Sequence, residues 1–196
     1  MEKPVKTESV GELVIKIYTD DCPESPRDWD NLGTMVCFHR NYIIGDEKHG
    51  FDRESLLEKI SEPNCVSLPI FLFDHSGQTI STCSDNFRMM DPVGWDWGKI
   101  GFIFADEDRI MNEYNLSSSD EITQDILDKV KNCLVSEVEV YRQYMEGDIY
   151  GFVIEDEEET HLDSCWGFYG LDDCLSEAKS IAEHINSELV GSGTGI

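Results

Sequence analysis

The sequence reads IYGFVI at residues 149–154, EDEEE at 155–159 and HLDSCWGFY at 161–169. The first and last of these segments are rich in β-branched and aromatic residues, which favour strands. The five consecutive acids between them belong to residue types that are rarely buried, so they indicate a turn in solvent. The stretch therefore predicts a two-stranded antiparallel hairpin with residues 155–159 at its tip.

A second hairpin is predicted at residues 66–83. There an apolar strand is followed by the turn residues His75-Ser76-Gly77-Gln78 and by another short strand. Pro69 lies inside the first of these strands and indicates an edge or a bulge. Further strand-like segments occur at residues 12–19, 34–39 and 99–105.

Helical periodicity is strongest between residues 122 and 145. Apolar residues recur there at spacings of three and four, at Ile122, Ile126, Val130, Cys133, Leu134, Val138, Tyr141 and Met145. Shorter helices are predicted at residues 51–60, from Asp106 and from Leu171. Because the strands come in hairpin-like pairs and the helices do not alternate regularly with them, we expect an α+β fold, with an antiparallel sheet packed by about three to four helices.

The chain length of 196 residues suits one domain with a substantial core. We expect a loose leader at residues 1–11, a single α+β domain at 12–190 and a flexible tail at 191–196. No apolar run is long enough for a membrane span, and the polar N-terminus has no secretory signal. The seven cysteines are odd in number and widely spaced, which favours reduced thiols and a cytoplasmic location.

The formal net charge is -26, from 41 acids and 15 bases. So few bases exclude direct binding of nucleic acid and of anionic membranes, since both ligands are held by Lys and Arg. Disorder is also disfavoured, because aromatic residues make up 10% of the chain. Residues 100–196 hold 23 acids and 5 bases, so the second half carries most of the excess.

These acids concentrate on segments that we expect to be exposed. The candidate partner-binding residues are Asp106, Glu107, Asp108, Asp120, Glu121, Asp125, Glu155, Asp156, Glu157, Glu158 and Glu159. One interpretation is a solvated surface that keeps the protein soluble. The other is a surface that imitates the negative charge of DNA and binds the basic nucleic-acid groove of a nuclease or DNA-binding protein.

A polar cluster at residues 20–39 is the main candidate for a metal site. Cys37 and His39 would share one face of a strand, and with Cys22 they could bind zinc or another divalent metal. The sequence has no Cys-x-x-Cys pair, however, and residues 28–39 lack the final Glu of a calcium loop. The alternative is an ordered turn in which Asp side chains accept backbone hydrogen bonds.

A thiol enzyme is a further alternative, using Cys165 with His161, or Cys174 at a helix start. Neighbouring acids oppose thiolate formation there, and no nucleophile motif is present, so we assign no catalytic residue and expect a non-enzymatic protein. Trp95, Trp97 and residues 166–170 are either core aromatics or contact residues for a partner.

Four stretches carry a resemblance to known sequences. They are DDCPESPRDWDNLGTM at residues 20–35, GKIGFIF at 98–104, VYRQYMEGDIYG at 140–151 and DSCWGFYG at 163–170. Over residues 12–185 the chain resembles a family of uncharacterised proteins of bacteriophages, plasmids and other mobile elements. The resemblance implies an inhibitor of host defence, of the anti-CRISPR kind that binds Cas9 or of the antirestriction kind. The alternatives are a metal- or thiol-dependent enzyme acting from residues 20–39 and 161–174, and an acidic adaptor.

Overall fold

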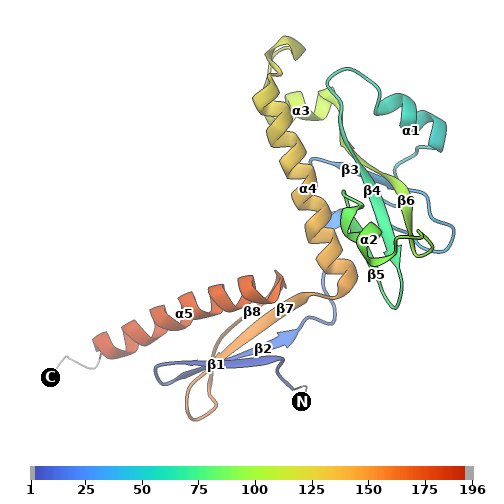
Figure 1. Ribbon diagram of the computed structural model, residues 1–196. Coiled ribbons are helices and arrows are strands. Elements are labelled where there is room, and N and C mark those ends of the chain that lie inside the picture. Colours follow the sequence, from blue (N-terminus) through green and yellow to red (C-terminus); the bar gives the residue numbers. More distant parts are fainter. Residues whose placement is uncertain (1–2, 193–196) are drawn as a thin grey trace. The chain divides into compact units, whose positions relative to one another are not determined.

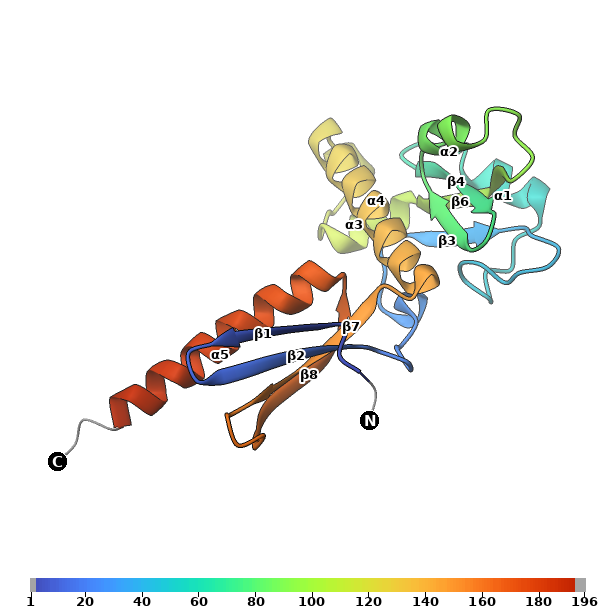
Figure 2. The same ribbon diagram turned by 60° about the horizontal axis from the view of Figure 1, so that its bottom comes forward.

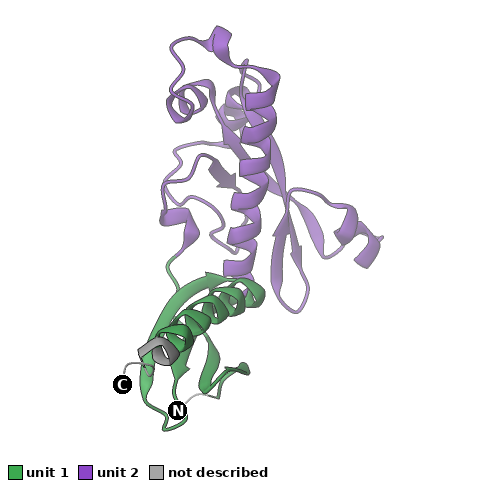
Figure 3. Ribbon diagram, turned by 90° about the vertical axis from the view of Figure 1, so that its left-hand side faces the viewer, with its two compact units in different colours: residues 1–24, 147–196 green, residues 25–146 purple. Residues whose placement is uncertain are grey.

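The computed structural model describes residues 3–192, and the chain divides into two compact units (Figure 3). Unit 1 combines residues up to 24 with those from 147 onward, and unit 2 consists of residues 25–146. The sequence predicts one domain at 12–190 and gives no sign of this division. A unit assembled from both ends of a chain leaves no single boundary for the sequence pattern to mark.

Unit 1 is a four-stranded antiparallel sheet packed by one helix (Figures 1 and 2). The strand order is β1-β2-β7-β8. The elements are β1 (Lys6–Val10), β2 (Leu13–Thr19), β7 (Ile149–Glu155), β8 (His161–Tyr169) and α5 (Leu171–Ser192). The predicted hairpin of residues 149–169 is confirmed, and it forms half of this sheet.

The predicted loose leader is wrong for residues 6–10, which form β1. This segment alternates partly buried and exposed residues, and it pairs with β2 through a turn in which Gly11 has φ +63°. It is hard to recognise because an edge strand needs few apolar residues. At the other end, residues 191 and 192 belong to α5, so the expected tail is helical there, and residues 193–196 lie outside the described residues.

The core of unit 1 lies between the sheet and α5. Ile15 pairs with Ile154 and Ile17 with Phe152, so one face of the two central strands is apolar and fully buried. Helix α5 packs on that face through Leu175 and through small residues, namely Cys174, Ala178 and Ala182.

Unit 2 contains the second antiparallel sheet, with strand order β3-β6-β4-β5. Its strands are β3 (Thr34–Cys37), β4 (Val66–Asp74), β5 (Gln78–Ser81) and β6 (Trp97–Ala105). Its helices are α1 (Arg53–Lys59), α2 (Asp85–Met90), α3 (Glu107–Glu113) and α4 (Gln124–Glu146), with short 3-10 turns at Pro26–Asp28 and Ser119–Glu121.

The sheet of unit 2 is covered on both faces. Met35 lies in the core that α4 shares with β4, β5 and β6, whereas the next residue, Val36, lies in a smaller core with Leu56 of α1. The period predicted for α4 is confirmed, because Val130, Leu134, Val138 and Tyr141 are its buried residues. Pro69 is tolerated in β4 because β5 pairs only with Phe71–Asp74, and a register shift follows at Ile70/Phe71.

The α+β class and the antiparallel pairing predicted from the sequence are confirmed. The strands form two sheets, and α2 raises the number of α-helices to five among residues 3–192. The sequence predicts no helix where α2 lies, since six residues are too few to show a helical period.

Candidate functional site

The acidic hairpin tip of unit 1 lies between β7 and β8. Glu155 ends β7 and its Oε2 is 2.5 Å from Lys16 Nζ, so this acid is neutralised. Asp156 closes the turn, because its Oδ1 accepts hydrogen bonds from the backbone N–H groups of Glu158 at 2.9 Å and Thr160 at 2.8 Å. Glu157, Glu158 and Glu159 are exposed. The tip therefore has a structured base and three acids in solvent.

Unit 1 is more acidic for its size than unit 2. By sequence it holds 18 acids and 4 lysines, a balance of -14, whereas the larger unit 2 holds 23 acids and 11 bases, a balance of -12. Three of the four lysines already bind acids, Lys6 and Lys179 at Glu8 and Lys16 at Glu155. Most of the negative charge of unit 1 is thus not neutralised within it.

Helix α5 adds a set of exposed acids that are not among the candidate partner-binding residues. They are Asp172, Asp173, Glu177, Glu183 and Glu188. Positions 173 and 177 are one turn apart, about 6 Å along the helix axis. The sequence signal was present, since acids alternate there with the apolar residues that pack on the sheet.

The predicted acids of unit 2 near α3 are largely engaged in contacts within the fold. Asp106 is the N-cap of α3 and also forms an ion pair with Lys59, whose Nζ lies 3.0 Å away. Burial raises the pKa of Asp106, but the hydrogen bond from the Arg109 N–H and the Lys59 charge outweigh it and hold the pKa below its usual value. Glu107 accepts a 2.8 Å hydrogen bond from Asn64, and Asp108 is exposed.

The other predicted acids of unit 2 lie before and within the start of α4. Asp120 and Glu121 are exposed on a 3-10 turn capped by Ser118, rather than on α4 itself. Asp125 is in the first turn of α4 and binds Lys129, with 2.6 Å between Oδ2 and Nζ. The predicted residues are therefore distributed over both units, six in unit 2 and five in unit 1.

Arg27 organises the polar segment that the sequence marked at residues 20–39. Its side chain is 5% exposed, and Nε lies 2.7 Å from Asp46 Oδ1 while Nη1 lies 3.1 Å from Glu137 Oε2. Nη2 donates to Gly33 O at 2.7 Å. The carboxylate of Glu137 in turn accepts the N–H groups of Leu32 and Gly33. The one base among the five acids of residues 20–33 is thus the centre of a buried structural network.

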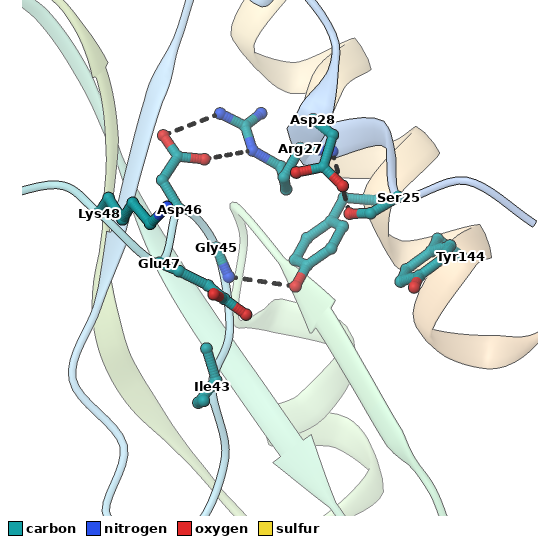
Figure 4. A pocket seen from close by; sticks show the side chains of 10 residues that line it. Ser25, Arg27, Asp28, Ile43, Gly45, Asp46, Glu47, Lys48 and Tyr144 are labelled. Carbon is teal, nitrogen blue, oxygen red and sulfur yellow. Dashed lines mark hydrogen bonds and ion pairs between the residues drawn. The ribbon is translucent and has the colours of Figure 1, made fainter.

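A pocket of about 560 Å³ opens beside this network (Figure 4). Figure 4 shows Asp28, Glu47 and Tyr144 around it, from the Pro26–Asp28 turn, the 43–48 loop and α4. The Tyr141 hydroxyl accepts a 3.1 Å hydrogen bond from the Gly45 N–H. Each nitrogen of the Arg27 guanidinium already donates within the fold, so the pocket offers Lys48 rather than Arg27 as an available cation.

The three predicted zinc ligands are placed as follows. Cys22 is exposed in unit 1, whereas Cys37 ends β3 and His39 follows it in unit 2. The His39 ring stacks on Tyr42, with centroids 4.9 Å apart. Burial, with a contribution from the Asp46 charge, raises the pKa of Cys37 to about 12, which opposes the thiolate that zinc requires. Across residues 3–192 no group of three or more His, Cys, Asp or Glu side chains is arranged to hold a metal ion.

The residues of the alternative thiol site make other contacts. His161 Nε2 lies 3.1 Å from Ser164 Oγ, and the Cys165 thiol points to the Trp166 carbonyl at 3.9 Å. Cys174 is buried, and burial raises its pKa to about 11. The imidazole therefore engages a hydroxyl, and the helix-start thiol is held in its neutral form.

None of the helices of residues 3–192 combines the length and the apolar character needed to cross a bilayer. We call the exposed acids of unit 1, at residues 157–159 and on α5, its acidic surface. This surface and the Arg27 network are the two candidate sites among the described residues. The chain matches no protein-family model, and it has no significant match among curated proteins or solved structures.

Proposed function

We propose that this protein is a non-enzymatic, acidic inhibitor of a host defence nuclease. It acts in the bacterial cytosol by occupying a basic nucleic-acid groove of its target, and the resemblance to mobile-element proteins makes Cas9 and restriction complexes the proposed targets. The observation that carries the proposal is the charge of unit 1, -14 with three of its four lysines already bound to acids.

The arrangement of these charges supports imitation of DNA. Phosphates follow one another by about 3.4 Å of axis along one strand of duplex DNA. Positions 173 and 177 of α5 are about 6 Å apart along the helix axis, which is close to twice that spacing. The hairpin tip adds Glu157, Glu158 and Glu159, all of which are exposed. A basic groove would therefore meet charges at separations comparable to those of its own ligand.

The structured base of the tip also favours binding. Asp156 fixes the turn and the Lys16–Glu155 pair fixes the end of β7, so the exposed acids need little ordering when they meet a partner. Binding driven by such charges is fast and weakens as salt screens them.

The test measures DNA cleavage by purified Cas9 and by a purified restriction enzyme in the presence of the protein, over a series of salt concentrations. We expect inhibition that weakens with salt. The double variant E157K/E158K should reduce affinity about tenfold at low salt and flatten its salt dependence. These two positions leave Asp156 and Glu155 in place, so the hairpin itself is preserved.

The matched control is E54K/E58K, which makes the same change of charge on exposed positions of α1 in unit 2. Its affinity should stay within about threefold of that of the original protein. If both double variants weaken affinity equally, the net charge alone, and not the hairpin tip, determines binding. Undiminished inhibition by E157K/E158K would remove the hairpin tip from the mechanism.

A further inference from the structure

Unit 2 exposes four large apolar side chains at the end of α2 and in the loop that follows it. Met89 is 74% exposed, Met90 66%, Val93 75% and Trp95 85%, all within seven residues of sequence. We call these four residues the apolar tip. Single exposed apolar residues are ordinary, but a contiguous group marks an interaction site. Tryptophan and methionine are also the residue types that contribute most at such sites.

The loop that carries the tip is held by its own hydrogen bonds. Asp91 accepts the Val93 N–H at 3.1 Å and the Asp96 N–H at 2.9 Å through its carboxylate, and its carbonyl accepts the Trp97 indole N–H at 2.9 Å. Gly94 has φ +79°, a backbone conformation that a residue with a side chain would adopt only with strain. The outward position of Trp95 is therefore built into the loop, which lies at the periphery of unit 2 in Figure 2.

The base of the tip is anchored in the core. Phe87 of α2 is buried and lies 5.5 Å from Phe73, ring centroid to centroid, while Trp97 lies 6.2 Å from Phe71. The sequence left Trp95 and Trp97 with two interpretations each, and the structure separates them. Trp97 packs on Phe71 and donates its indole N–H to the Asp91 carbonyl, whereas the Trp95 side chain is exposed.

A recess adjoins the tip. A cavity of about 350 Å³ is lined by Met90 together with Phe73, Met145, His75 and Glu146, among others. The surface thus combines an exposed indole with a hollow that both apolar and polar side chains line. Such a surface fits a partner that offers both an apolar pocket and a side chain to fill the hollow.

The charge around the tip decides which partner fits. Residues 74–98 hold four Asp and one Arg, and the whole chain has a net charge of -26. A second copy of the chain or an anionic bilayer would bring like charge to the contact. A protein whose apolar pocket has a basic rim is complementary.

We propose that the apolar tip inserts into an apolar pocket, rimmed by basic side chains, on the same host nuclease that the acidic surface binds. The inference rests on the proposed function and adds to it a contact on unit 2 whose apolar part salt does not screen. The nuclease is then bound through two chemically different surfaces, one acidic and one apolar.

The experiment measures affinity for purified Cas9 and for a purified restriction enzyme at low and high salt. We expect W95A/V93S to weaken binding at least about tenfold at both salt concentrations. M89S/M90S, which changes α2 instead of the loop, should do the same and guards against a local folding defect. Ile43→Ser removes an apolar residue that is 78% exposed elsewhere in unit 2 and should leave affinity unchanged.

The outcomes separate the two proposals. Absence of binding by the original protein contradicts the proposed function and the tip contact that depends on it. If E157K/E158K weakens binding and the two tip variants do not, the tip contact alone is contradicted. Sedimentation that shows a dimer lost in W95A/V93S, or binding to phosphatidylcholine vesicles lost in it, would assign the tip to another copy or to a membrane and overturn the inference.

Discussion

Trp166 of β8 covers Gly151 of β7 so closely that a Cβ atom on Gly151 would lie 2.2 Å from Trp166 Cε3. The indole also lies beside Tyr18 of β2, with ring centroids 6.3 Å apart. One glycine thus allows an aromatic pair to lie across three neighbouring strands of unit 1.

Gly151→Ala should displace this indole. We expect a loss of about 1–3 kcal/mol in the free energy of unfolding, because the added methyl group overpacks the contact. Since Trp166 is 49% exposed, the ring has room to swing outward, which would show as a red shift of fluorescence. In the W166A background the same change should be nearly neutral, and a full loss there would contradict the assignment. Gly98→Ala, which meets nothing within 4 Å, is the control.

Arg27→Ala should strongly destabilise unit 2. It leaves Glu137, with a side chain 11% exposed, and Asp46 without their cation, and a broken buried pair costs about 3–5 kcal/mol. Urea unfolding followed by near-ultraviolet circular dichroism measures this loss. Arg142→Ala on α4 removes exposed pairs with Glu139 and Glu146 and should change stability by about 1 kcal/mol or less. Similar losses in both variants would argue against a buried network.

Alkaline pH should destabilise the protein partly through Cys37. Burial raises the pKa of this thiol to about 12, so its neutral form is favoured by folding. The stabilisation is complete below the unfolded pKa of about 8.5 and is lost as pH rises toward about 12. Within that window the free energy of unfolding should fall by up to about 1.4 kcal/mol per pH unit on account of this group. Cys37→Ala should remove that share of the slope, and an unchanged slope would contradict the prediction.

Acid should loosen the loop that carries Trp95. The hydrogen bond from the Asp96 N–H, helped by that of Val93, lowers the pKa of Asp91. The loop is therefore fully held above the ordinary Asp pKa of about 3.9 and is released as pH falls through the lower folded value. The amide resonances of Val93 and Asp96 should shift toward random-coil positions in that range. In Asp91→Asn they should not respond to pH there.

Thiol reactivity tests the alternative of a thiol enzyme that uses Cys174. With iodoacetamide at neutral pH we expect rapid labelling of the exposed Cys22, Cys83 and Cys165, because accessible thiolate is the reactive form. Cys174 should react slowly, since burial raises its pKa to about 11. Peptide mass spectrometry over time measures both rates. Selective fast labelling of Cys174 would instead favour the enzyme.

Helices and strands could be predicted from the sequence where a pattern of adjacent residues determines them. The period of α4 and the β-branched and aromatic residues on both sides of the 155–159 tip are properties of adjacent residues, and both predictions are confirmed. Strand β1 and helix α2 were missed because an edge strand and a six-residue helix need no distinctive pattern. The zinc set combined Cys22 of unit 1 with Cys37 of unit 2, since spacing along a sequence does not reveal which unit a residue enters.

The site was predictable only in part, for the same reason. The charge of the exposed acids can be counted in the sequence, and Glu157 and Glu158 are indeed exposed. The partners of the other acids are distant in sequence. Glu137 meets Arg27 across 110 positions, and Asp106 at the start of α3 meets Lys59 of α1, so only the fold shows which acids are already neutralised.

The assembly of unit 1 from both ends of the chain has a consequence for synthesis on the ribosome. Lys16 and Glu155 are 139 positions apart, so the β1–β2 hairpin emerges long before the strand that completes its sheet. At about 5–20 residues per second, the 122 residues of unit 2 delay that strand by about 6–24 seconds. A nonsense codon after residue 146 would therefore spare every residue of unit 2 while leaving the apolar face of β2 without a cover, and the exposed acids of residues 157–188 would be among the last parts of the molecule to be synthesised.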